Sequence, residues 1–226
     1  MSKKLQALVD QAYQVFANYR LIGGLQDVCA HCVDEADIQK LEKSFVKDIS
    51  QDWLSAYNDS AQSEVLDITE FKHFLPRYLD LIAQLDFPSH SAELALKKLG
   101  EFNLDQDFKP EEAQLLRDFS EAFFEDCLSR YPLGTLLDLE DILIMFYKAK
   151  LPIEALFKIW GGTLKRESLL HFKNLYESLR GGKSSNAFAD DLPEYNRILS
   201  QWIEEQKSLG DKTEESLFYK ALLLDY

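Results

Sequence analysis

Residues 2–19 read SKKLQALVDQAYQVFANY, and the spacing of their apolar side chains decides the fold class. An α-helix brings residues three and four apart onto one face, whereas a half-buried strand would need strict alternation. Ser2 belongs to the residue types that commonly cap helix N-termini. The stretch therefore predicts an amphipathic helix beginning after Ser2. The apolar positions on its expected buried face are Leu5, Leu8, Val9, Ala12, Phe16 and Tyr19.

The same helical spacing continues outward from this stretch along nearly the whole chain. Capping residues and glycine pairs mark the expected helix boundaries, and the connections between them are short. We therefore expect an all-α protein of about ten helices, forming one domain over residues 1–226. Its architecture should be an irregular multi-helix bundle or stacked antiparallel helical hairpins. Helix starts are indicated at Asp34, Ser50, Ser91, Pro110, Asp138, Pro152 and Thr213.

Pro76 interrupts the helical stretch at residues 68–85, which reads ITEFKHFLPRYLDLIAQL. Proline lacks a backbone N–H, so it must either kink this helix or end it and start a new one after Leu75. Arg77 is spaced to form a surface ion pair with Asp80 or Glu70.

The overall composition is that of a soluble globular protein with excess negative charge. Hydrophobic residues make up 46% of the 226 residues, and the formal net charge is −14. Such a charge repels phosphate backbones and anionic lipids, so we expect neither nucleic-acid nor membrane binding. The N-terminus has no apolar stretch typical of a secretory signal, and three cysteines do not suggest a disulfide framework. We therefore expect a cytoplasmic protein.

Residues 101–141 contain twelve acidic residues but only three basic ones. This favours an interaction protein that binds a basic protein partner, for example a cytosolic immunity protein that neutralises a basic toxin domain. The alternative is that the acidity serves solubility alone. The sequence does not indicate an oligomeric state. Aromatic and acidic residues expected to contact the partner are Phe119, Glu121, Phe123, Phe124, Glu125, Asp126 and Tyr131.

Cys29, His31 and Cys32 form the strongest candidate for chemistry. Two thiolates at this spacing can bind one tetrahedral metal through a tight turn, and zinc accepts imidazole as a further ligand. With His73 as a fourth ligand, the chain would be a metal-binding regulatory or enzymatic protein. The alternatives are two structural thiols and a histidine packed among aromatic neighbours. No catalytic motif of the hydrolase, zinc-protease or dinucleotide-binding kind occurs in the sequence, so an enzyme is not indicated.

Three segments together resemble an uncharacterised family of bacterial helical proteins. They are the cysteine turn at residues 29–32, the Leu-x-x-Tyr segment at residues 54–57, and DITEFKHFLPR at residues 67–77. The resemblance covers about the first 90 residues and implies an all-helical fold and a bacterial origin. It departs from the family at His31, where another cysteine is expected. It implies no activity.

Overall fold

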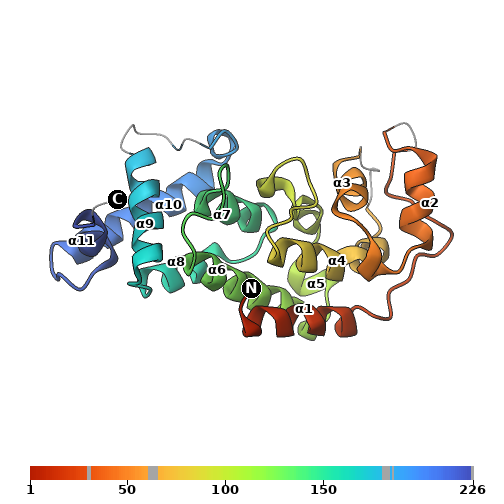
Figure 1. The fold of residues 1–226 in the computed structure, drawn as a ribbon, viewed down its shortest axis with the longest axis horizontal. Coiled ribbons are helices and arrows are strands. Elements are labelled where there is room, and N and C mark those ends of the chain that lie inside the picture. Colours follow the sequence, from red (N-terminus) through yellow and green to blue (C-terminus); the bar gives the residue numbers. More distant parts are fainter. Residues whose placement is uncertain (30–31, 61–65, 180–183, 185, 225–226) are drawn as a thin grey trace. The chain divides into compact units, whose positions relative to one another are not determined.

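The computed structural model describes residues 1–29, 32–60, 66–179, 184 and 186–224. These residues form eleven α-helices and four short 3-10 helices, with no β-strand among them (Figure 1). The predicted all-α, multi-helix fold is therefore confirmed. The α-helices are α1 (Lys3–Val15), α2 (Glu35–Lys43), α3 (Gln51–Asp59), α4 (Ile68–Ala83), α5 (Leu104–Asp107), α6 (Pro110–Leu128), α7 (Leu139–Lys148), α8 (Ile153–Gly161), α9 (Arg166–Leu179), α10 (Pro193–Gly210) and α11 (Leu217–Leu222). The 3-10 helices are η1 (Val46–Asp48), η2 (Ala92–Leu94), η3 (Lys97–Glu101) and η4 (Ala189–Asp191).

The chain divides into two compact units. Unit 1 comprises residues 1–119 and 148–151, and unit 2 comprises residues 120–147 and 152–226. This division describes packing, and the single folding domain expected from the sequence stays a prediction. Within the described part of the chain, every helix is too short or too polar to cross a membrane.

Helix α1 forms where the sequence predicts it and packs against α4 within unit 1 (Figure 1). The Ser2 side chain accepts a hydrogen bond from the backbone N–H of Leu5, which satisfies one of the donors left open at a helix start. Leu5, Val9 and Ala12 are buried along one face of α1. The periodic apolar spacing thus places α1 on the core of unit 1.

Helix α4 continues through Pro76 from Ile68 to Ala83, so it does not restart after Leu75. Its N-cap is Asp67, whose carboxylate accepts the backbone N–H groups of Thr69 and Glu70. Eleven of its sixteen residues are buried. Helix α4 is therefore the central helix of unit 1, covered on most of its surface by other segments.

Aromatic side chains form the core of unit 2. The Trp202 ring lies 4.7 Å from the Phe157 ring, 5.1 Å from the Trp160 ring and 5.6 Å from the Phe172 ring, measured between centroids. These residues come from α8, α9 and α10, so one cluster joins three helices. Contacts of this kind add about 0.5–1.5 kcal/mol per pair to the effect of burying the rings.

Candidate functional site

Polar side chains of α4 reach segments that are distant in the sequence. The Glu70 carboxylate accepts the backbone N–H groups of Gln26 at 2.7 Å and Asp27 at 3.2 Å. Arg77 donates from Nε to the carbonyl oxygen of Ile49 at 2.7 Å. These bonds hold both the segment after α1 and the segment before α3 against α4.

Arg77 also forms the ion pair with Asp80 that the sequence suggests, at 2.8 Å. Both side chains are largely buried, so the pair does not lie on the open surface. The Tyr13 hydroxyl donates to the same Asp80 carboxylate at 2.9 Å, which joins α1 to α4. Burial, with the Asp80 charge as a second cause, raises the pKa of Tyr13 well above its usual value.

A groove of about 750 Å³ lies over this framework in unit 1. Its walls are the C-terminal end of α1 with the segment to residue 21, residues 42–48, and one side of α4. The volume falls within the range of about 300–1,000 Å³ typical of pockets for small molecules and cofactors. The apolar residues that line it are Phe16, Ala17, Leu21, Phe45, Val46 and Pro76.

Phe45 is the most unusual of these residues because it is 82% exposed to solvent. It precedes η1 and lies outside any helix, so no helical face requires an apolar residue at this position. An aromatic ring left in water at the rim of a groove is a common anchor in protein interfaces.

Positive charge predominates around the groove although the whole chain is acidic. Arg20, Lys43 and Lys47 line it, opposed by Glu42 and Asp48. One Glu42 oxygen is already engaged, accepting the backbone N–H of Leu25 at 2.9 Å. The groove is therefore better suited to a carboxylate than to a cation.

His73 lines the groove with its ring held in one tautomer. Its Nδ1 lies 3.0 Å from the carbonyl oxygen of Tyr19. A carbonyl only accepts, so Nδ1 carries the proton and Nε2 is left as an acceptor. Burial lowers the pKa of His73, and the nearby Arg20 charge acts in the same direction. The ring is thus neutral at physiological pH and can accept a hydrogen bond or act as a base.

The predicted metal ligands are only partly placed. The backbone N–H of Cys32 donates to the carbonyl of Cys29 at 2.8 Å, which forms the expected tight turn. His31 lies outside the described residues. Across the described ranges, no three His, Cys, Asp or Glu side chains gather in a way that could hold a metal. The metal site, with His73 as a ligand, stays a prediction.

The predicted partner-binding residues separate into two groups. Phe119, Phe123 and Phe124 are at most 1% exposed, so these three side chains belong to the core and do not form a surface for a partner. Leu116, Phe119 and Phe123 follow one another at spacings of three and four residues, which is the helical signal that could have assigned this face to the interior. Tyr131 is half-buried, and its ring lies 4.9 Å from the ring of His171.

The acidic residues of the same region are less available than the sequence suggests. Glu112, Asp126 and Glu140 are buried and serve as acceptors inside the protein. Asp126, which the sequence assigns to the partner surface, pairs with Arg130 at 2.5 Å. Glu121 and Glu125 keep contact with solvent. This part of α6 therefore presents fewer carboxylates to solvent than the number of its acidic residues suggests.

Lys98 is a buried titratable group that the sequence gives no reason to select. It is fully buried, its ammonium lies 4.2 Å from the Tyr57 ring centroid, and it donates to the carbonyl of Asp27. Burial lowers its pKa to about 8, opposed by the charges of Asp27 and Glu70. Because no solvent reaches Lys98, it contributes to the core and does not present a site to a ligand.

Comparisons with protein-family models, with curated proteins and with solved structures gave no match to this chain. The resemblance to a bacterial helical family therefore stays an expectation from residues 29–77.

Proposed function

We propose that this protein is a binding protein that recognises another protein through the groove of unit 1. The observation that carries this proposal is the exposed Phe45 ring beside a groove lined by apolar side chains and three cations. The segment that fits would insert an apolar side chain and place a carboxylate near Arg20, Lys43 and Lys47. A protein segment supplies both groups within a few residues.

The charge of the chain supports a protein partner over a nucleic acid. The formal net charge of −14 opposes the approach of a phosphate backbone, whereas a short acidic segment meets only the local positive charge of the groove. The neutral His73 adds a hydrogen-bond acceptor to the groove, which a backbone N–H of the partner can use.

Photo-crosslinking from position 45 tests this function directly. A benzoyl-phenylalanine placed at Phe45 should capture a protein in cells that produce this chain, and Lys47→Glu in the same protein should reduce the yield. The matched control is the same probe at Leu136, which is 97% exposed and lies in unit 2. If position 45 captures nothing beyond what position 136 captures, the groove is not an interaction site.

The basic partner suggested by the sequence, such as a toxin domain neutralised by an immunity protein, is a separate proposal. It rests on acidic residues that contact solvent, including the half-buried Glu121 and the exposed Glu125, and does not use the groove.

A further inference from the structure

Cys29 and Cys32 lie at the two ends of one tight turn in unit 1. The carbonyl oxygen of Cys29 accepts the backbone N–H of Cys32 at 2.8 Å and that of Val33 at 3.2 Å. Residues three positions apart that are joined by such a bond have Cα atoms less than about 7 Å apart. A disulfide needs about 4.4–6.8 Å between the same two atoms. The turn thus brings the two cysteines into the range that a disulfide requires.

The chain is anchored on both sides of this turn. Before the turn, the carboxylate of the buried Asp27 accepts the backbone N–H of Asp67 at 2.6 Å, and the Asp27 N–H donates to Glu70 at 3.2 Å. After the turn, Val33 is only 5% exposed, and α2 begins at Glu35. These anchors do not use either sulfur atom, so oxidation of the sulfurs leaves them in place. The turn should therefore keep its backbone conformation in both redox states.

The two thiols of the turn are open to solvent, unlike the third cysteine of the chain. Cys32 is exposed and Cys29 is half-buried, whereas Cys127 is fully buried in unit 2. Burial raises the pKa of Cys127 to about 12. Because the thiolate is the reactive form, Cys127 stays unreactive at neutral pH. Oxidation is therefore directed to the pair in the turn.

We propose that Cys29 and Cys32 are a redox pair, which forms a reversible disulfide by exchange with a low-molecular-weight disulfide. The exposed Cys32 thiolate attacks one sulfur of that disulfide, breaks its S–S bond and releases one small thiol after proton uptake. The Cys29 thiolate then attacks the Cys32 sulfur of the mixed disulfide and releases the second small thiol. The two protein thiols are oxidised, and the small disulfide takes up their two electrons and two protons.

The turn keeps the second step within the chain. Two groups held in one turn react at a high effective concentration, whereas a second mixed disulfide needs another collision with the small disulfide. The mixed disulfide at Cys32 should therefore be short-lived. Exposed disulfides are also the more readily reduced ones, so an excess of small thiol reverses the reaction. The pair uses no residue that lines the groove of unit 1, so this inference is independent of the function proposed above.

Thiol trapping on the purified full chain tests the pair. The chain is equilibrated at a series of ratios of oxidised to reduced glutathione, quenched with acid, unfolded and alkylated. Mass spectrometry of the tryptic peptide of residues 21–40, which contains both cysteines, then reads their state. Cys29 and Cys32 should lose alkylation together, the peptide should lack two hydrogens, and dithiothreitol should restore both thiols. Cys127 is the internal control and should be alkylated at every ratio.

Two single variants separate the steps of the exchange. Cys29→Ser removes the second thiol, so it should accumulate the mixed disulfide between Cys32 and glutathione, which the native chain does not. Cys32→Ser should form its mixed disulfide more slowly, because Cys29 is the less exposed residue. A rate that is not lower would overturn the assigned order of attack.

Two results would overturn the redox pair itself. In the first, the native chain keeps both thiols, or accumulates only mixed disulfides, at the most oxidising ratios. In the second, the purified native chain retains stoichiometric zinc that Cys29→Ser loses, as measured by atomic emission. The two sulfurs would then be metal ligands and not a redox pair.

Discussion

Lys72 and Glu112 form an ion pair inside unit 1, with Nζ and Oε2 2.8 Å apart and side chains only 5% and 0% exposed. The Tyr19 hydroxyl donates to the other Glu112 oxygen at 2.6 Å. Lys72 also donates to the carbonyl of Asp107 and lies over the Phe108 ring. Tyr19 is therefore bonded at two points, since its hydroxyl donates to Glu112 and its carbonyl accepts from His73. Tyr19 thus connects the buried ion pair to His73 in the wall of the groove.

Removing one partner of this pair should destabilise the protein strongly. Lys72→Met leaves the buried Glu112 carboxylate with only the exposed Lys109 ammonium, 3.8 Å away, as counter-charge. We expect a loss of about 3–5 kcal/mol in the free energy of unfolding. Urea denaturation measures it. The double variant Lys72→Met/Glu112→Met should recover much of the loss, since no charge stays buried. A double variant less stable than Lys72→Met would contradict this account. Lys207→Met, which breaks the exposed pair with Glu204, should change stability by less than about 1 kcal/mol.

The same pair should make stability depend on acidic pH. Burial raises the pKa of Glu112, but hydrogen bonds from Lys72, Tyr19 and the Lys109 N–H outweigh it, so the pKa lies below the usual 4.5. A carboxylate with a lowered folded-state pKa stabilises above its unfolded-state pKa and loses that contribution as pH falls through the folded-state value. Below about pH 4.5, the native chain should therefore lose stability relative to the double variant. Thermal unfolding between pH 3 and 6 measures this, and a constant difference would exclude it.

Gly100 should not tolerate a side chain. A Cβ there would lie 2.0 Å from the carbonyl oxygen of Lys148, and both residues belong to unit 1. Since a backbone atom blocks the space, Gly100→Ala must separate η3 from the end of α7, at a loss of about 1–3 kcal/mol or more. Gly134→Ala is the control, because its Cβ would make an ordinary 3.6 Å contact. Calorimetric melting of both variants decides the point, and equal melting temperatures would show that the backbone moves freely.

Charge reversal tests the basic partner that the sequence suggests. Glu121→Lys and Glu125→Lys should slow association with such a partner, because complementary charge mainly raises the association rate. Asp126 must be kept, since it pairs with Arg130 and its replacement would disturb folding. Stopped-flow association at low and moderate salt is the measurement. An unchanged rate with a partner that binds the native chain would remove these two residues from its interface.

Local patterns predicted the helices well because caps and periodicity act within one element. Ser50 accepts the Trp53 N–H at the start of α3, and Pro110 begins α6, as the sequence indicates. The last helix differs, since Ser216 and not Thr213 caps α11. The Thr213 hydroxyl instead accepts the N–H of Glu215 in a turn. Both residue types favour caps and turns, so sequence alone does not separate the two uses.

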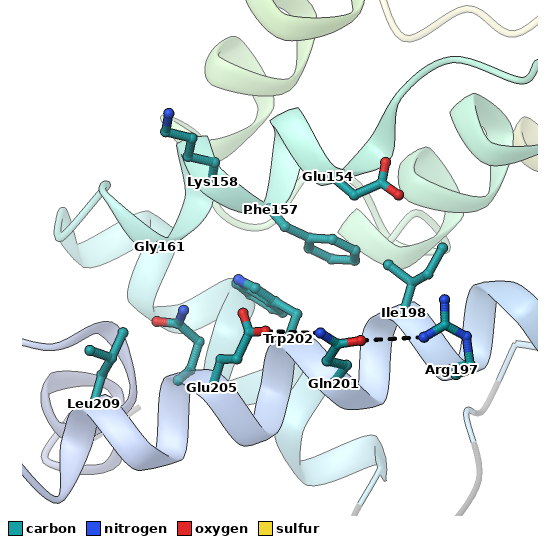
Figure 2. Close-up of a pocket in the computed structure, with 11 residues that line it drawn as sticks. Glu154, Phe157, Lys158, Gly161, Arg197, Ile198, Gln201, Trp202, Glu205 and Leu209 are labelled. Atoms are coloured by element: carbon teal, nitrogen blue, oxygen red, sulfur yellow. Dashed lines mark hydrogen bonds between the residues drawn. The ribbon is translucent and has the colours of Figure 1, made fainter.

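The groove of unit 1 could not be predicted in the same way, and neither could a second groove, of about 550 Å³, between α8 and α10 in unit 2 (Figure 2). The groove of unit 1 combines residues near positions 20, 45 and 73, whose proximity depends on long-range bonds such as Arg77 to the carbonyl of Ile49. Gln206, which lines the second groove, has no sequence feature that distinguishes it from Gln201 five residues earlier. Only the helix packing decides that one amide is buried beside Gly161 and the other lies at the surface.

Lys98 should make stability depend on alkaline pH. Its pKa is lowered by burial from 10.5 to about 8, so between these values the unfolded chain binds a proton that the folded chain does not. Stability then rises with pH across this window, because folding releases that proton and proton release becomes more favourable as pH increases. The variant Lys98→Met removes this group while keeping an unbranched side chain over Tyr57. Urea unfolding from pH 7.5 to 10.5 should show the native chain gaining stability relative to Lys98→Met as pH increases. A difference that falls or stays constant would mean that Lys98 is charged in the core, with Asp27 and Glu70 sufficient to balance it.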